Sequence, residues 1–132
     1  AKKGQHSVGA FRQFARDVGR KINCQVAVTL AQLGPRGYYP LLARLYLPAG
    51  WLRENADAAE KGVPEEHRRF TPKTEIGLAL LDTVREAGEP ARPVVAEAGY
   101  VGDTGFAEGL RGRGLTAAEG SEEVIGRANE RA

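Results

Sequence analysis

Val94-Val95-Ala96-Glu97-Ala98-Gly99-Tyr100 is the segment that indicates the fold class most directly. Its apolar start favours a short strand at 93–97, and Gly99 interrupts that strand just after the carboxylate of Glu97. In α/β proteins, ligands bind beyond the carboxyl ends of strands. The pattern therefore predicts an acidic side chain at the edge of a sheet, and Glu97 is the candidate catalytic and metal-binding residue.

The residues before this strand predict a helix. Thr71 is suited to the N-cap and Pro72 to the first helical position, while Gly88 is suited to the C-terminal cap. Ile76, Leu80 and Val84 recur at helical spacing and form one apolar stripe. A helix at this point can bring the strand at 93–97 parallel to a neighbouring strand.

Two further strands are expected at 24–33 and 38–47. Apolar and polar residues alternate through 24–33, and the turn Gly34-Pro35-Arg36-Gly37 separates the two segments. They should pair as an antiparallel hairpin. Beyond the candidate site, Asp103 is suited to cap a glycine-rich helix that ends near 111–114. The expected fold class is thus α/β.

Length and composition are those of one globular domain over 1–132. The chain has 42% hydrophobic and 27% charged residues, and it contains no apolar run long enough to span a membrane. The single Cys24 is expected in the core and fits a reducing cytoplasm. We expect a loop with a short helical turn at 11–17 and a frayed or weakly helical tail at 117–132. Between them, we expect an insertion at 49–70 that contains a short helix, a loop and an Ala/Glu-rich turn at 54–61, with Trp51 packed on the core.

Charge is concentrated at the start of the chain. Segment 1–23 has a net charge of +5, whereas the whole chain carries only +2. A basic arm suits a DNA backbone, and a solvated N-terminus is the alternative. The candidate nucleic-acid-binding residues are Lys2, Lys3, Arg12, Arg20 and Lys21.

An ordered series of segments over about 1–115 resembles the catalytic core of DDE-type insertion-sequence transposases. Ala96-Glu97-Ala98-Gly99-Tyr100 is similar to the second acidic motif of that family. The other matching segments, in order, are Lys2-Lys3-Gly4, His6-Ser7-Val8-Gly9, Arg12-Gln13-Phe14, Gly19-Arg20-Lys21, Asn23-Cys24-Gln25-Val26, Arg44-Leu45-Tyr46-Leu47-Pro48 with Trp51, Gly62-Val63-Pro64, Thr71-Pro72-Lys73, and Asp103 with Phe106 and Leu110.

The resemblance implies a partial ribonuclease-H-like mixed sheet, namely an antiparallel hairpin plus a further strand, with flanking helices. It also implies three carboxylates that hold Mg²⁺ ions for cleavage and joining of DNA at insertion-sequence ends. The implied partner is DNA and the implied location is the bacterial cytoplasm, at the nucleoid. The family's central strand would precede residue 1, so exposed strand edges and self-association are expected.

The chain departs from the family pattern at each acidic position. The first aspartate would lie upstream of Lys2, and the second position holds Glu97 in place of aspartate. The third acid has no clear match, although the tail offers Glu119, Glu122, Glu123 and Glu130. We therefore expect a fragment or degenerate remnant that is inactive alone. The alternatives are a non-catalytic, sequence-independent DNA-binding module and an unrelated α/β domain in which Glu97 only ends a strand.

Overall fold

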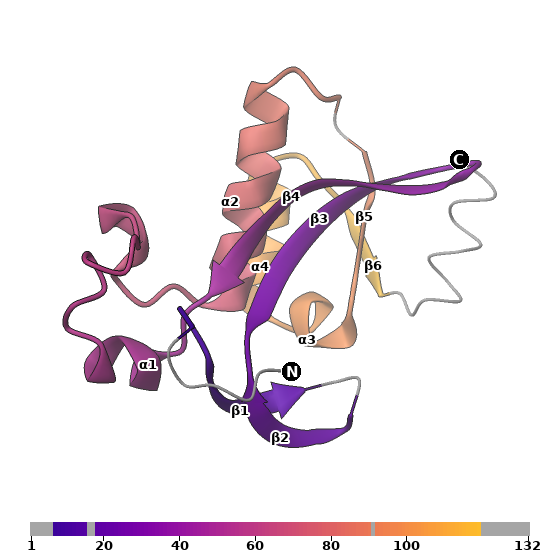
Figure 1. The fold of residues 1–132 in the computed structure, drawn as a ribbon. Coiled ribbons are helices and arrows are strands. Elements are labelled where there is room, and N and C mark those ends of the chain that lie inside the picture. Colours follow the sequence, from indigo (N-terminus) through magenta and orange to yellow (C-terminus); the bar gives the residue numbers. More distant parts are fainter. Residues whose placement is uncertain (1–6, 16–17, 91, 120–132) are drawn as a thin grey trace. The chain divides into compact units, whose positions relative to one another are not determined.

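A computed structural model describes residues 7–15, 18–90 and 92–119, which form helices and small sheets (Figure 1). The strands of this part of the chain pair as three two-stranded sheets. Contacts divide the chain into two compact units: unit 1 comprises 1–28 and 44–73, and unit 2 comprises 29–43 and 74–132. The mixed α/β class is confirmed, while the boundaries of a single domain stay a prediction.

Unit 1 begins with a β-hairpin that the sequence analysis missed. Strands β1 (Phe11–Ala15) and β2 (Arg20–Cys24) are antiparallel, with Phe11 opposite Cys24 and Ala15 opposite Arg20. The expected helical turn at 11–17 is therefore wrong. Burial alternates along β1 with the period of a strand, and Gly19 takes a φ of +68° in the connection.

The core of unit 1 surrounds Trp51. This side chain is 2% exposed and packs with Leu47, Ala58 and Val63, which confirms its expected structural role. Helix α1 (Ala49–Glu54) carries Trp51, and a 3-10 turn, η1 (Glu65–His67), follows later. The short helix expected within 49–70 is present as α1, which ends where the Asn55 side-chain amide donates to the carbonyl of Trp51 at 2.8 Å. Turns follow at 56–62, in agreement with the turn expected at 54–61.

Strands β3 (Val26–Gly34) and β4 (Gly37–Tyr46) form the expected hairpin around a two-residue connection, Pro35-Arg36. Gly37 has a φ of +127°, which explains a glycine at this turn. Cys24 is buried as expected, but it ends β2 rather than beginning β3. The division between the units falls within β3 and within β4.

Unit 2 contains the predicted helix and the strand after it. Helix α2 (Lys73–Glu86) follows Pro72 and buries Ile76, Leu80 and Leu81, and Gly88 lies beyond its end with a φ of +99°. Strand β5 (Val94–Ala96) is followed by α3 (Ala98–Val101), α4 (Thr104–Gly112) and β6 (Ala117–Glu119). No helix of the described residues is long and apolar enough to span a membrane.

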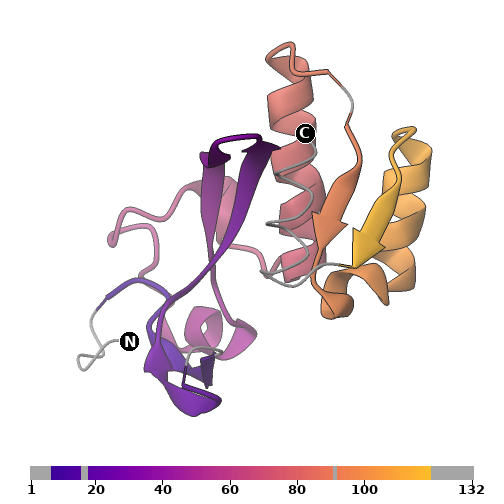
Figure 2. The same cartoon turned by 90° about the vertical axis from the view of Figure 1, so that its right-hand side faces the viewer.

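Strands β5 and β6 run parallel and lie side by side (Figure 2). The expectation that the strand at 93–97 has a parallel neighbour is correct, and the neighbour is β6. The start of the tail is thus extended rather than helical at 117–119, and residues 120–132 lie outside the described part. All three residues of β6 are exposed. Pairing with β5 therefore determines this strand, since the Ala-Ala-Glu sequence has little strand propensity of its own.

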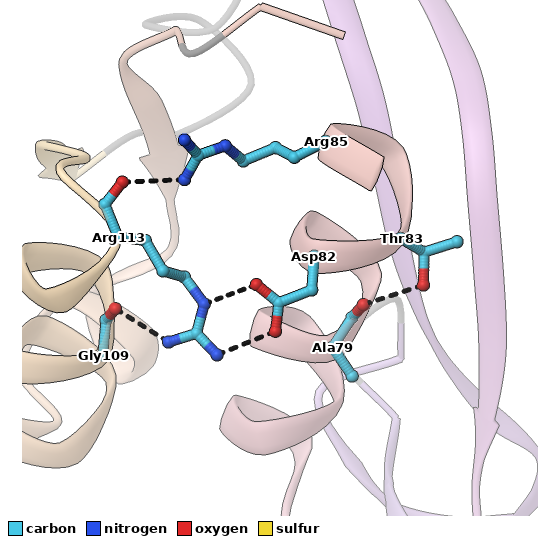
Figure 3. Close-up of polar contacts among 6 residues, drawn as sticks. All are labelled: Ala79, Asp82, Thr83, Arg85, Gly109 and Arg113. Atoms are coloured by element: carbon cyan, nitrogen blue, oxygen red, sulfur yellow. Dashed lines mark hydrogen bonds and ion pairs between the residues drawn. The ribbon is translucent and has the colours of Figure 1, made fainter. Parts of the chain in front are cut away.

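Helices α2 and α4 are joined by polar contacts (Figure 3). The Arg113 guanidinium donates to both carboxylate oxygens of Asp82, at 2.7 and 2.8 Å, and to the carbonyl of Gly109 at 2.8 Å. Arg85 in turn donates to the carbonyl of Arg113 at 2.7 Å. The hydrogen bond from Arg113, and then its positive charge, lower the pKa of Asp82. These contacts hold the end of α4 against α2.

Candidate functional site

Glu97 lies directly after β5 and is the N-cap residue of α3. Its side chain is exposed, and its carbonyl accepts from the backbone amides of Tyr100 at 2.9 Å and Val101 at 3.1 Å. The backbone at Glu97 is therefore fixed by a strand on one side and a helical turn on the other. This is the position at the carboxyl end of a strand that the sequence predicted.

Aromatic packing holds the residues that follow Glu97. The rings of Tyr100 and buried Phe106 meet edge to face with centroids 5.5 Å apart. A Cβ added to Gly77 of α2 would lie 3.5 Å from the Phe106 ring and 3.8 Å from the Tyr100 ring, so both rings pack on that helix. Burial, and then the negative charge of Glu97, raise the pKa of the Tyr100 hydroxyl. The Glu97 carboxylate is thus close enough to act on Tyr100 electrostatically.

A second carboxylate lies at the same edge of the parallel pair. The register sets Ala96 beside Glu119, so that Glu97 and Glu119 both stand at the carboxyl ends of β5 and β6. Glu119 is one of the four acids considered for the third family position. The other three, Glu122, Glu123 and Glu130, lie outside the described residues.

The carboxylates at this edge do not complete a metal site within 7–15, 18–90 and 92–119. Oxygen donors of this kind suit Mg²⁺. However, these residues contain no group of three histidine, cysteine, aspartate or glutamate side chains that could hold a metal ion. Asp103 is a helix cap, as expected, because its side chain accepts from the amide of Phe106 at 2.8 Å. The described ligand set is therefore too small for the two-metal centre that the resemblance implies.

The predicted nucleic-acid-binding residues that can be placed lie on the β1–β2 hairpin. Arg12, Arg20 and Lys21 are all exposed, whereas Lys2 and Lys3 lie outside the described residues. Phe14 pairs with Lys21, and Arg12 is two residues from Phe14 on β1. These three side chains consequently share one face of the hairpin, while Arg20 belongs to the opposite face.

Phe14 is a candidate that the sequence analysis missed. It is 57% exposed, which is unusual for a phenylalanine, and basic side chains adjoin it on its face. A basic surface that contains an exposed aromatic ring is typical of single-stranded nucleic-acid binding. The sequence of residues 11–15, Phe-Arg-Gln-Phe-Ala, has no period-two alternation of apolar and polar residues, so it gives no local signal for this exposed ring.

Comparison with known proteins gives one result. The model of the family described as DDE superfamily endonuclease matches residues 1–121, which include unit 1, most of unit 2 and the edge that carries Glu97 and Glu119. No curated protein and no solved structure matches the chain significantly. Because the family model covers most of the sequence, the resemblance to the DDE catalytic core is confirmed, and the chain belongs to the DDE superfamily endonuclease family.

Proposed function

We propose that this chain is part of the catalytic core of a transposase-type, metal-dependent DNA endonuclease, with Glu97 at the second acidic position. The observation that carries the proposal is the placement of Glu97 at the carboxyl end of β5, beside the end of the parallel strand β6 and Glu119. Membership in the endonuclease family supports DNA as the substrate. Cleavage and joining at insertion-sequence ends, at the bacterial nucleoid, are the finer form of this proposal.

We further propose that this chain alone is inactive or nearly so. Its described residues hold too few metal ligands together. Glutamate at the second position also moves the carboxylate oxygens by about one methylene relative to aspartate, and Mg²⁺ demands near-ideal octahedral geometry. Misplacement by about 1 Å can cost roughly 10²-fold in rate. The missing ligands would have to come from outside the described residues.

The test of activity is nicking of supercoiled DNA with and without Mg²⁺. We expect no cleavage above background for a protein consisting of residues 1–132, and no difference between it and Glu97→Gln. Robust Mg²⁺-dependent cleavage that disappears in Glu97→Gln would contradict the proposed inactivity and would support Glu97 as a working ligand.

A separate measurement tests metal binding at Glu97 without any activity. Mn²⁺ can replace Mg²⁺ and broadens the NMR signals of nearby nuclei. We expect broadening to be centred on α3 and Tyr100 in the unmodified chain and to be lost in Glu97→Gln. Glu108→Gln is the matched control, because this exposed residue of α4 also loses one charge. Broadening that survives Glu97→Gln unchanged would refute the assignment.

A second candidate function is non-catalytic DNA binding through the β1–β2 hairpin. The face formed by Arg12, Phe14 and Lys21 favours it, because this face offers two cations and an exposed ring. Affinity should fall steeply with salt and should not depend on Mg²⁺. Neutralising Lys2, Lys3, Arg12, Arg20 and Lys21 together should abolish binding, and unchanged binding would exclude this function.

A further inference from the structure

Basic and aromatic side chains gather in unit 1, where the end of β4 meets the chain that leads into α2. Segment 68–73 contains three basic residues and no acidic one, and Arg44 of β4 adds a fourth cation. The three basic residues of the segment are exposed, and Arg44 is half-buried. Neither the candidate metal site nor the β1–β2 hairpin includes any of these residues.

Side-chain contacts join β4 to this segment. Arg44 and Tyr46 share one face of β4, because they are two residues apart on a strand. The rings of Phe70 and Tyr46 meet edge to face with centroids 6.1 Å apart, and the Lys73 ammonium lies 4.9 Å from the centroid of the Tyr46 ring. Nη2 of Arg44 donates to the hydroxyl of Thr71 at 3.4 Å. These five residues are called the Arg44 cluster below.

The cations of the Arg44 cluster have no carboxylate partner within the described residues. Ion pairs in that part of the chain use only Asp57 and Asp82 as carboxylates. Glu66 and Glu75, the acidic residues nearest to segment 68–73 in sequence, are exposed and pair with none of these cations there. Positive charge that is gathered on one surface without a carboxylate attracts an anionic partner.

Hydrogen bonding of the Arg44 guanidinium is incomplete. A guanidinium has five N–H donors. Within the described residues, Arg44 donates only to Thr71, at a distance longer than the usual range of about 2.7–3.2 Å. Its Nε is buried and has no hydrogen-bond partner in that part of the chain, which is costly for a charged group. Because the bond to Thr71 is weak, a small rotation of the side chain can bring the guanidinium to an anion at the surface.

The Phe70 ring indicates which anion fits the cluster. Its residue is 42% exposed, although the ring packs against Tyr46. A free phosphate needs cations alone, whereas a nucleic-acid strand presents phosphates and bases in alternation. Proteins that bind single strands combine basic side chains for the backbone with aromatic rings on which bases stack. The bases of a duplex are stacked on one another, so an exposed ring beside cations favours an unpaired strand.

We propose that the Arg44 cluster binds single-stranded DNA, with a phosphate held by Arg44 and Lys73 and a base stacked on Phe70. The inference rests on the proposed function for the choice of DNA as the nucleic acid. The cluster does not contain Glu97, and binding is measured in EDTA without cleavage. Failure of binding here and failure of Mn²⁺ broadening at Glu97 are therefore separate results.

The experiment uses the whole chain and an oligomer of about eight deoxythymidines, within the usual site size of single-strand binders. NMR follows the Nε–H signal of Arg44 during the titration. We expect saturable binding that slows hydrogen exchange of this group, because a phosphate supplies the missing acceptor. An oligomer with neutral methylphosphonate linkages keeps the bases but loses the backbone charge, and it should bind at least about tenfold more weakly.

Variants test the two parts of the cluster separately. Arg44→Lys keeps the charge but removes the planar guanidinium, and it should weaken binding by about fivefold or more. Arg111→Lys is the matched control at an exposed arginine of α4, outside the cluster, and should change affinity by less than about twofold. Phe70→Leu keeps an apolar side chain but removes the ring, and it should weaken binding by about tenfold. Because Phe70 is exposed, this variant keeps the test valid if Arg44→Lys fails to fold.

Three results would overturn the inference. Unchanged exchange of the Arg44 Nε–H at saturating oligomer would place the DNA elsewhere, for example on the β1–β2 hairpin. Equal affinity of a thymidine–adenine duplex of the same length, with no loss in Phe70→Leu, would show that no base stacks on this ring. Slowed exchange with inorganic phosphate but not with the oligomer would show a site for a small anion rather than for a DNA strand.

Discussion

The apolar cores of the two units are built from different ranges of the sequence. In unit 1 the buried cluster of Leu47, Trp51, Ala58 and Val63 comes from one short segment. In unit 2 the buried cluster extends from Leu81 to Leu115, and Leu30 packs against it from a distant part of the chain. Val8 and Phe11 also pack against the first cluster from the start of the chain, so both cores have distant contributors, but the buried members lie closer together in sequence in unit 1 than in unit 2. We expect unit 2 to depend more on the contacts between its elements.

We expect the largest effect from removing the central side chain of the unit 1 core. Trp51→Ala should lower the free energy of unfolding by about 3–5 kcal/mol, because a fully buried indole is replaced by a cavity. If the cores are independent, hydrogen exchange should accelerate in 44–73 but not in 94–119. Equal acceleration in both segments would show that the two units unfold together.

The next effect tests how closely α4 approaches α2. A Cβ at Gly109 would lie 2.5 Å from Cδ1 of Leu78, the flexible end of a half-buried side chain that has to move. In urea unfolding, Gly109→Ala should therefore lose most of the stabilisation of about 1 kcal/mol that alanine brings over glycine inside a helix. Gly112→Ala is the matched control, because nothing lies within 4 Å of its added Cβ. That control should be neutral or slightly stabilising. A larger cost at Gly112 than at Gly109 would contradict the observed packing.

A smaller effect is expected from the pair of Asp82 and Arg113. Because the pKa of Asp82 is lowered in the folded chain, its contribution to stability is present above the ordinary aspartate pKa of about 3.9 and is lost as pH falls below that value. Asp82→Asn should therefore be less stable than the unmodified chain near neutral pH, and the difference should shrink in acid. The difference should be about 1 kcal/mol or less, because both side chains are partly exposed. A pH-independent difference in thermal unfolding would contradict the ion pair.

The smallest effect is expected at the candidate site, as a change in the pKa of the Tyr100 hydroxyl. Glu97→Gln should lower the pKa of the Tyr100 hydroxyl, measured by ultraviolet titration, but should leave it above the ordinary tyrosine value because burial is the larger cause. The raised pKa means that Tyr100 stabilises the fold below about pH 10 and that this contribution is lost as pH rises through the folded pKa. Glu119→Gln is the control. An unchanged titration in Glu97→Gln would place the Glu97 carboxylate away from Tyr100.

The elements that the sequence predicted are those with strong local signals. The Gly-Pro-Arg-Gly turn predicted the β3–β4 hairpin, the apolar stripe predicted α2, and Asp103 predicted the start of α4. The β1–β2 hairpin was missed because arginine and glutamine obscure the alternation along β1. Strand β6 was missed because a partner, rather than its own Ala-Ala-Glu sequence, makes it extended.

The candidate site was predictable only in part, for a similar reason. Glu97 follows an apolar run, so its place at a strand end could be inferred from nearby residues. Glu119 could be named only as one of several acids, because its position beside Ala96 depends on pairing across two helices. Phe14 was missed because its exposure depends on which face of a hairpin is covered, and local sequence does not specify that.

The register between β5 and β6 also determines where the carboxylates of Glu97 and Glu119 lie relative to each other. The amide of Val94 donates to the carbonyl of Thr116 at 2.8 Å, and Gly114 turns the chain toward that bond with a φ of +70°. Inserting or deleting one residue between α4 and β6 would shift this alignment by one position and turn the Glu119 side chain to the other face of the strand. Loop length at 113–116 thus determines which face of the parallel pair carries the Glu119 carboxylate, so natural length variation here would mark which relatives keep this arrangement.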